Sequence, residues 1–521
     1  MPNDSPAVHR TLYMSAETGR ELAERPAAAF LIGGYDGSGN YGDIAQLEAA
    51  LQLLADLGDG AFALPLVDLR YLESHRRRSL APTPNFDPAR VLAFSLGGAD
   101  SAQAAANVGL VPASLPEQLS RTVTYIYGGG YLNSRWAARS LEMVEAAEAL
   151  AARAGVPRHE MISSGLQIEP RWARTLGPEA RHLLAGLRQV GVRDERSAEA
   201  AAHFTNGDKT PPVLRSGDDA VGVLHSLLEA APPPPAVSRL LVLNLHLCPG
   251  EWVTADPERL LGWLRVFLLA LAESSGRRLR LQPVIANGEE RVKERATLAR
   301  FLAGLVPLDA TAATPIVLAR SQAAESARAL AGADLTIGTS YHVALSSLLT
   351  GTPAILISEN DYYSQKAQGL ARDFSLPTAL FPGPGLEPSE AARAVLRALA
   401  DPGGPLRRDA LVERAHEVFR RRRAVESELR GELRSALLAS SASGKPKRPS
   451  VAAEDRDALL GSLVWSQERI AALGEQVERY EEGRTLQEQH LRELTQTVSW
   501  RLTRPLRWAK AVLAGRFGGD Q

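Results

Sequence analysis

The first residue whose setting could support chemistry is His342. It follows the apolar stretch Leu335–Ile337 and Gly338, a combination that predicts a buried parallel strand ending in a tight turn. Thr339 or Ser340 can then cap the helix that follows. His342 is therefore expected in the first turn of a helix, at the carboxyl end of a strand, where open α/β sheets bind ligands and helix amino termini attract phosphate. An ordinary strand–helix connection with a surface histidine fits the same pattern.

A glycine-rich loop is the second candidate ligand-binding feature. Residues 33–43 contain five glycines and lie between a strand predicted at Ala27–Ile32 and a helix predicted at Ile44–Leu57. Glycines let a ligand or another backbone approach closely, and successive amides can bind an anion. The loop has neither a Walker A ending nor the Rossmann glycine spacing, and a flexible turn is the alternative. The candidate binding residues here are Gly39, Asn40, Gly42 and Asp43.

A second junction of the same kind follows the strand predicted at Thr122–Tyr127. Gly128, Gly129 and Gly130 come directly after this strand, and a helix rich in alanine and glutamate is expected at 134–154. The pattern of a strand, then glycines, then a helix thus occurs twice. The three glycines are accordingly candidate binding residues.

Charged residues occupy two further strand ends. Arg193 ends the strand that begins at Val190, and its ordinary role would be an ion pair with Asp194 or another nearby carboxylate. Asp218 and Asp219 stand together in a polar turn. Paired carboxylates can bind hydroxyl groups, act as a base or cap a helix, and the helix cap is favoured here.

Composition restricts the functional class. The chain has 521 residues, 45% hydrophobic and 23% charged, which indicates a soluble protein of two or more domains. A formal net charge of −1 argues against nucleic-acid binding. The single cysteine, Cys248, excludes an intrachain disulfide and a cysteine zinc site, and no other cluster has metal-ligand spacing. The start has no apolar signal segment, and the longest apolar run, near Leu260–Ala272, is too short for a bilayer. A cytoplasmic enzyme or binding protein is expected.

Strand and helix patterns alternate in two halves, which predicts an α/β fold of two doubly wound, Rossmann-like domains facing a cleft, the GT-B type of architecture. The proline run at 231–236 is a stiff spacer between the halves. The predicted parts are an N-terminal arm at 1–26, an N-terminal domain at 27–230, the spacer at 231–236, a C-terminal domain with closing helices at 237–439, a linker at 440–452, a coiled coil at 453–498 and a tail at 499–521.

The C-terminal part has its own patterns. Leu463, Ile470, Val477, Leu491 and Val498 fall at heptad spacing, so a short coiled coil and a homo-oligomer are expected. The tail from Ser499 interleaves Trp and Leu with Arg and Lys, which suits a peripheral contact with a membrane or an acidic partner. A helix packed against the body is the alternative. The arginine run 420–423 is interpreted as a solvated helix face.

Several of these junctions together resemble one family. The chain is similar to the polysaccharide pyruvyl transferase family, which has a GT-B-like fold, over about Ala27–Leu376. The tail's Ser-Trp-Arg-Leu-Thr segment is similar to an ending of bacterial cell-surface glycosyltransferases. The matching motifs are 40–43, 128–130, Val192-Arg193-Asp194, Gly217-Asp218-Asp219-Ala220, His342 with Gly351-x-Pro353, and the continuation Tyr363, Lys366 and Gly369.

The resemblance implies transfer of a pyruvyl group from phosphoenolpyruvate to sugar hydroxyls, with formation of a cyclic ketal. The acceptor would be a cell-surface polysaccharide or its lipid-linked precursor, and no cofactor would be needed. Arg193 would bind the anionic groups of the donor, and His342 would be the general acid or a phosphate ligand. Gly338 with its helix and the glycine turns would add amide donors.

One departure from the family stands beside His342. The family commonly reads Arg-Leu-His where this chain has Ser340-Tyr341-His342, so a cation expected near the donor is missing, and Lys366 or another arginine would have to replace it. Two alternatives therefore stay open: a GT-B glycosyltransferase that uses a nucleotide sugar, and a non-catalytic scaffold of a glycan-assembly complex. The enzyme would work in the cytoplasm, with the tail at the inner face of the membrane.

Overall fold

All elements of the structure described below belong to one compact unit of the chain. In this computed structural model the described residues are 11–14, 27–35, 40–55, 61–66, 91–97, 111–113, 123–134, 136–137, 140–141, 143–144, 160–204, 209–225, 229, 240–245, 256–275, 280–286, 291–305, 315–318, 323–357, 361–377 and 385–442.

The first half of the chain forms a sheet with the strand order β5-β1-β4-β3-β2-β6-β8. The run from β4 to β8 is parallel, whereas β1 pairs antiparallel with β4 and β5. The order β4-β3-β2-β6-β8 is that of a doubly wound sheet. The strands are β1 (Thr11–Met14), β2 (Ala27–Ile32), β3 (Ala61–Leu66), β4 (Val91–Gly97), β5 (Val111–Ala113), β6 (Val123–Ile126) and β8 (Met161–Ser163).

Two of these strands were not predicted from the sequence. β1 lies within the predicted N-terminal arm, and β5 was not expected. Both are short strands at one edge of the sheet, joined to it by antiparallel pairing. β1 reads Thr-Leu-Tyr-Met, which suits a strand, but its pairing with β4 depends on residues distant in the sequence.

A second, wholly parallel sheet of order β11-β10-β9-β7 stands beside the first. The predicted glycine turn at 128–130 is largely strand β7, and the segment Met161–Ile168 contains two short strands, β8 and β9. The division occurs at Gly165, whose φ of +66° bends the chain from one sheet into the other. The strands are β7 (Gly129–Leu132), β9 (Leu166–Ile168), β10 (Val190–Val192) and β11 (Val213–Arg215).

Two helices of this half begin at a side chain that accepts an amide of the first turn. α2 begins at Tyr41, three residues earlier than expected, because the side chain of Asn40 accepts the amide of Gly42. Asp194 caps α8 by accepting the amide of Ser197. The helices are α2 (Tyr41–Ala55), α6 (Pro170–Arg174), α7 (Pro178–Ala185), α8 (Glu195–Ala201) and α9 (Val221–Leu224).

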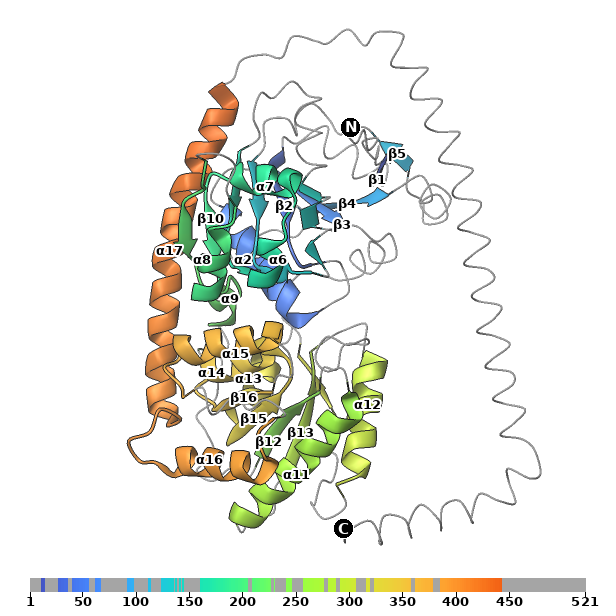
Figure 1. The fold of residues 1–521 in the computed structure, drawn as a ribbon, viewed down its shortest axis with the longest axis vertical. Coiled ribbons are helices and arrows are strands. Elements are labelled where there is room, and N and C mark those ends of the chain that lie inside the picture. The colour runs from blue at the N-terminus through green and yellow to red at the C-terminus, as the bar shows by residue number, and fades with distance from the viewer. Residues whose placement is uncertain are drawn as a thin grey trace, which may run out of the picture. The chain divides into compact units, whose positions relative to one another are not determined.

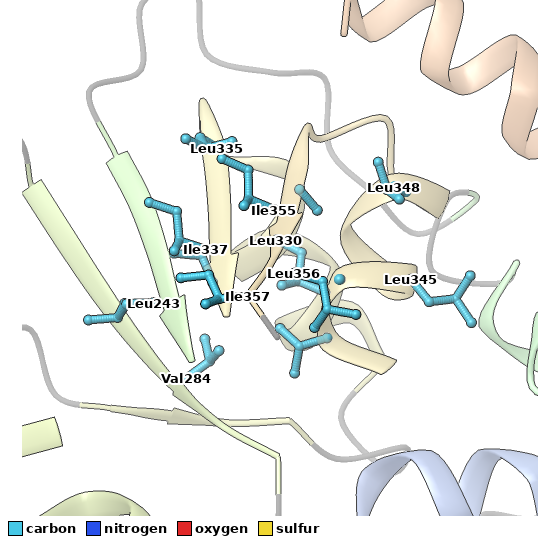
Figure 2. Close-up of a cluster of buried hydrophobic side chains, with 14 of the residues drawn as sticks. Leu243, Val284, Leu330, Leu335, Ile337, Leu345, Leu348, Ile355, Leu356 and Ile357 are labelled. Atoms are coloured by element: carbon cyan, nitrogen blue, oxygen red, sulfur yellow. The ribbon is translucent and has the colours of Figure 1, made fainter. Parts of the chain in front are cut away.

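The second half is a doubly wound parallel sheet of order β14-β13-β12-β15-β16, as predicted (Figure 1). Apolar side chains of β15, β16 and α14 form the buried cluster in Figure 2, which includes Ile337, Ile355 and Leu345. The elements are β12 (Leu240–Asn244), α11 (Pro257–Ser275), β13 (Arg280–Ile285), α12 (Arg291–Ala303), β14 (Ile316–Val317), α13 (Ala323–Ala331), β15 (Leu335–Gly338), α14 (Tyr341–Leu349), β16 (Ala354–Leu356), α15 (Asp361–Asp373) and α16 (Pro388–Ala400).

A long helix, α17 (Arg408–Ala442), ends the described chain and packs on both halves (Figure 1). Leu411 and Ala415 belong to the core around the second sheet, whereas Leu429 and Leu433 belong to the core around β2 and α2. The predicted C-terminal domain therefore ends in a helix that also completes the first half. This helix extends three residues into the linker predicted from residue 440.

The spacer at 231–236, the coiled coil at 453–498 and the tail at 499–521 lie outside the described residues. Within the described chain, no helix has both the length and the apolar composition needed to cross a bilayer.

Candidate functional site

The centre of the candidate site is the buried carboxylate of Asp218, which contacts residues from both halves of the chain. Its Oδ2 atom lies 2.9 Å from Nη2 of Arg193 and 3.6 Å from Nε2 of His342. Its Oδ1 atom accepts the amide of Ala220 and the side-chain amide of Gln46. The bond to Ala220 is not a helix cap, because Ala220 is itself the N-cap residue of α9 and no side chain caps this helix, so the predicted cap is not formed. The second oxygen faces Arg193 and His342.

Electrostatics keep this carboxylate ionised. Burial alone would raise the pKa of Asp218, but the guanidinium of Arg193 and the nearby His342 bring it well below its usual range. Arg193 does not pair with Asp194, its sequence neighbour, which instead caps α8 and accepts a hydrogen bond from Gln365. The ion pair predicted for Arg193 is therefore made with Asp218 and not with Asp194.

Arg193 has unused hydrogen-bonding capacity although it is only 4% exposed. Its Nε and Nη1 atoms have no hydrogen-bond partner among the described residues. Its guanidinium carbon lies 4.8 Å from the ring centre of Tyr341, a cation–π contact. Leaving a buried donor without a partner costs about 1–3 kcal/mol, so these N–H groups are suited to receive an anionic ligand.

His342 occupies the first turn of α14, as predicted, and 14% of its side chain is exposed. Burial lowers its pKa, and the charges of Arg193 and Lys366 act in the same direction, while Asp218 opposes them. The imidazole is therefore neutral at pH 7 without a ligand. An anion bound beside it would reverse this balance and favour the protonated form.

Gly42 lies against this histidine. A Cβ atom at Gly42 would stand 1.8 Å from Nδ1 of His342, so only glycine lets α2 pass this close to the ring. Its neighbour Asn40 caps α2, and Asp43 lies beside Gly34. Gly39 lies outside the described residues. Gly42 therefore leaves room for the side chain of His342. The sequence of the loop does not indicate this role.

Asp219 serves a separate, structural network. It accepts the amide of Gly128 at 2.6 Å and the hydroxyl of Ser164, and it lies 2.7 Å from Nη1 of Arg422. Burial raises the pKa of Asp219, while Arg422 opposes that shift. Arg422 is itself buried and paired with Glu426, so this part of the arginine run is not a solvated face. The network ties α17 to the end of β6.

The remaining glycines contact protein side chains. The hydroxyl of Tyr362 donates to the carbonyl of Gly130, and a Cβ at Gly130 would overlap that hydroxyl. Nζ of Lys366 lies 4.4 Å from the ring centre of Tyr362 and 5.0 Å from that of Tyr363. Gly129 has a φ of +152° where β7 begins. Tyr362 was not identified as a candidate from the sequence. Its place in the first turn of α15 is the feature that could have indicated it.

The turn before α14 follows the predicted form with one difference. Gly338 passes close to Asn244, and the amide of Thr339 donates to the carbonyl of that residue. Ser340 is at the cap position, but its side chain makes no cap hydrogen bond. Within the described chain, no group of three or more His, Cys, Asp and Glu residues could bind a metal ion.

The structure thus brings Arg193, Asp218 and His342 together and adds Gln46, Tyr341 and Gly42 around them. The fold and this cluster define an α/β protein with a buried group of charged and polar side chains near the carboxyl ends of its strands. The sequence profile described as polysaccharide pyruvyl transferase matches residues 40–361, which is more than half of the chain. The chain belongs to the polysaccharide pyruvyl transferase family.

Comparison with curated proteins gives no match. Among solved structures, the chain is similar to an α,α-trehalose-6-phosphate synthase from Burkholderia multivorans, with a TM-score of 0.45, 14% identity and coverage of 81% of this chain and 100% of the other. It is also similar to the corresponding UDP-forming enzyme from Burkholderia vietnamiensis, with a TM-score of 0.46, 13% identity and coverage of 80% and 99%. For Anabaena HepE in complex with UDP, the TM-score is 0.43, the identity 13% and the coverage 78% and 100%.

Proposed function

We propose that this chain transfers the pyruvyl group of phosphoenolpyruvate to two hydroxyl groups of a sugar, forming a cyclic ketal on a cell-surface polysaccharide or its lipid-linked precursor. The observation that carries the proposal is Arg193, which is buried and retains unpaired N–H groups beside Asp218 and His342. Membership of the pyruvyl transferase family supports the choice of donor.

Donor binding would rest on Arg193. A guanidinium can donate two parallel hydrogen bonds to a carboxylate or a phosphate. Lys366 lies close enough to lower the pKa of His342, and it supplies a second positive charge near the site. Lys366 is thus our candidate for the cation that the family has where this chain has Ser340.

His342 is proposed as the proton-transfer group. The anionic donor would raise the pKa of His342, and the protonated ring would give its proton to the methylene carbon of the donor. A sugar hydroxyl would bond to the neighbouring carbon and lose its proton. The bond from that carbon to the phosphate oxygen would then break and release inorganic phosphate. A second hydroxyl would close the ketal and lose its proton.

We propose that the reaction needs no cofactor and no metal ion, because Arg193 already offers donors to the anionic groups of the substrate. We also propose that the enzyme acts in the cytoplasm. Self-association through 453–498 and contact with the inner face of the membrane through 499–521 rest on the sequence patterns alone.

The test is an assay of the full-length protein with phosphoenolpyruvate and a panel of saccharides, in which phosphate release and the ketal product are both measured. We expect both signals with phosphoenolpyruvate, unchanged by a chelator. Consumption of a nucleotide sugar instead, with no phosphate release from phosphoenolpyruvate, would favour the glycosyltransferase alternative. Ketal formation that disappears with the chelator would contradict the metal-free mechanism.

A further inference from the structure

A cavity of about 270 Å³ adjoins the candidate site on the side of α17. Six charged residues line it together with three valines. They come from the ends of β10, β11 and α15, from the turn after β11, and from the middle of α17. The charged residues are Arg193, Arg215, Asp218, Asp373, Arg421 and Arg422.

The arginines around the cavity differ in how many of their N–H groups already have a partner in the protein. Arg422 is fully engaged by Asp219, Glu426 and the carbonyl of Ser216. Arg193, in contrast, has two donors without a partner although it is buried. The cavity therefore contains N–H groups that the protein itself does not satisfy.

Two further arginines line the same cavity, and only part of each guanidinium has a partner in the protein. Arg215 pairs with Glu195 at 3.0 Å, and both side chains are about half exposed. Arg421 donates to the backbone carbonyl of Asp373 at 3.2 Å, which leaves the rest of its guanidinium fork for other acceptors. Of the four arginines in the lining, Arg193, Arg215 and Arg421 thus retain N–H groups for a ligand.

We propose that this cavity binds a phosphate group through Arg193, Arg215 and Arg421. Arginine is the residue best suited to phosphate because its planar fork donates paired hydrogen bonds. Arg193 offers N–H groups without a partner, and Arg215 and Arg421 each retain part of their guanidinium for an anion. Gly217, with a φ of +68° and open space where its Cβ would stand, leaves room beside the two strand ends.

The position of the cavity connects it to the reaction. Asp218 and Arg193 line it, and the same Oδ2 atom of Asp218 lies 3.6 Å from Nε2 of His342. The bound phosphate is therefore either the phosphoryl group of the donor or free inorganic phosphate after its release. This link rests on the proposed function, whereas the phosphate site itself does not.

The test measures inorganic phosphate binding to the full-length protein by ³¹P NMR and calorimetry. Arg421→Gln should weaken binding about tenfold or more, because it removes a charge-assisted contact. Arg420→Gln is the matched control: it is the neighbouring exposed arginine of α17, it does not line the cavity, and it should leave the affinity unchanged.

A second variant changes the affinity in the opposite direction. Asp373→Asn removes a negative charge from the lining and should tighten phosphate binding severalfold. Asp361→Asn, at the exposed first turn of the same helix, is its control and should change the affinity much less. A variant that unfolds cannot tighten binding, so the opposite signs at Arg421 and Asp373 separate the site from general damage.

Competition with phosphoenolpyruvate distinguishes the two sources of the bound phosphate, the phosphoryl group of the donor and free inorganic phosphate. If the donor's phosphoryl group enters the cavity, phosphoenolpyruvate displaces phosphate and Arg421→Gln weakens both ligands. If only free phosphate enters, Arg421→Gln weakens phosphate alone, and the site stands as a phosphate site. No phosphate binding at millimolar concentration, or equal losses in Arg421→Gln and Arg420→Gln, would overturn the proposal. Phosphate binding with this pattern in a protein that forms no ketal would keep the site and reject the proposed function.

Discussion

Arg193 Nη2 lies 2.9 Å from Asp218 Oδ2, and both side chains are almost fully buried. Each residue compensates the charge of the other, so neither can be removed alone without leaving an unpaired charge in the interior. Breaking a buried ion pair by removing one partner costs roughly 3–5 kcal/mol. This relationship decides how the role of Arg193 can be tested.

Arg193→Lys keeps the positive charge but loses the paired donors. We expect the KM for phosphoenolpyruvate to rise about tenfold or more, because one point charge replaces a fork that can make two hydrogen bonds. The melting temperature should fall only modestly. Steady-state kinetics and thermal unfolding measure the two effects. Arg193→Ala is expected to unfold more easily because it leaves Asp218 unpaired, and a KM unchanged in Arg193→Lys would show that this guanidinium does not bind the donor.

His342→Gln should lower kcat about 10²- to 10⁴-fold, the usual contribution of a general acid. In the proposed mechanism the protonated ring is the active form. The rate of the wild-type enzyme should therefore fall as the pH rises through the pKa of His342 in the donor complex, and this alkaline decline should be missing from the variant. His203→Gln, at an exposed position after α8, is the control and should retain the wild-type profile. Equal rates for wild type and His342→Gln would exclude the role.

Gly42→Ala tests the close approach of α2 to His342. The added Cβ would overlap the imidazole, with 1.8 Å to its Nδ1 atom, so the ring must leave its present position. We expect a loss of activity similar to that of His342→Gln, with the protein still folded. Gly262→Ala in α11 is the matched control, because a Cβ there meets nothing within 4 Å and alanine stabilises a helix by about 0.5–1 kcal/mol. Full activity in Gly42→Ala would mean that the ring position is unimportant.

The elements that carry these residues could be predicted, but their partners could not. Strand ends and glycines placed Arg193, Asp218 and His342 at the correct edges of the sheets, because apolar runs and helix stops are local signals. The pairing of Arg193 with Asp218 rather than Asp194 depends on how β10 and β11 lie side by side. Likewise, Gly42 faces His342 across 300 residues of sequence, a distance over which local patterns carry no information.

Arg422 is another residue whose surroundings could not be predicted from local sequence patterns. In sequence it is one of four consecutive arginines, and such a run predicts a solvated helix face. In the structure only the packing of α17 against both halves buries this one side chain. Its guanidinium then lies within hydrogen-bonding distance of Asp219, Ser164 and the carbonyl of Ser216.

Arg422→Met should therefore destabilise the protein by roughly 3–5 kcal/mol, because it leaves the buried carboxylate of Asp219 without its counter-charge. Chemical unfolding measured by circular dichroism gives the comparison. Arg420→Met, one of the exposed arginines of the same run, should change the stability by less than about 0.5 kcal/mol. If the two variants have the same stability, the network around Asp219 does not stabilise the fold.

The last prediction concerns Asp373, at the end of α15. Burial raises its pKa from 3.8 to about 6, against the opposing charges of Arg421 and Arg215 and with the help of Asp194 and Asp218. The folded state therefore binds this proton more tightly than the unfolded state. The stabilising contribution is complete below pH 4 and is lost as the pH rises to about 6.

Asp373→Asn has no such titration, because its amide stays neutral. Relative to the wild type, the variant should gain stability as the pH rises from 4 to 7, and the gain should level off at about 1–2 kcal/mol, less than the full value for two pKa units because the carboxyl group is partly exposed. Thermal unfolding of both proteins at pH 4, 5, 6 and 7 measures the difference. A difference that is constant over this range, or that favours the wild type at pH 7, would show that ionised Asp373 is not destabilising. Phosphate added at pH 7 should widen the difference, because the anion and the carboxylate compete for Arg215 and Arg421 in the same cavity.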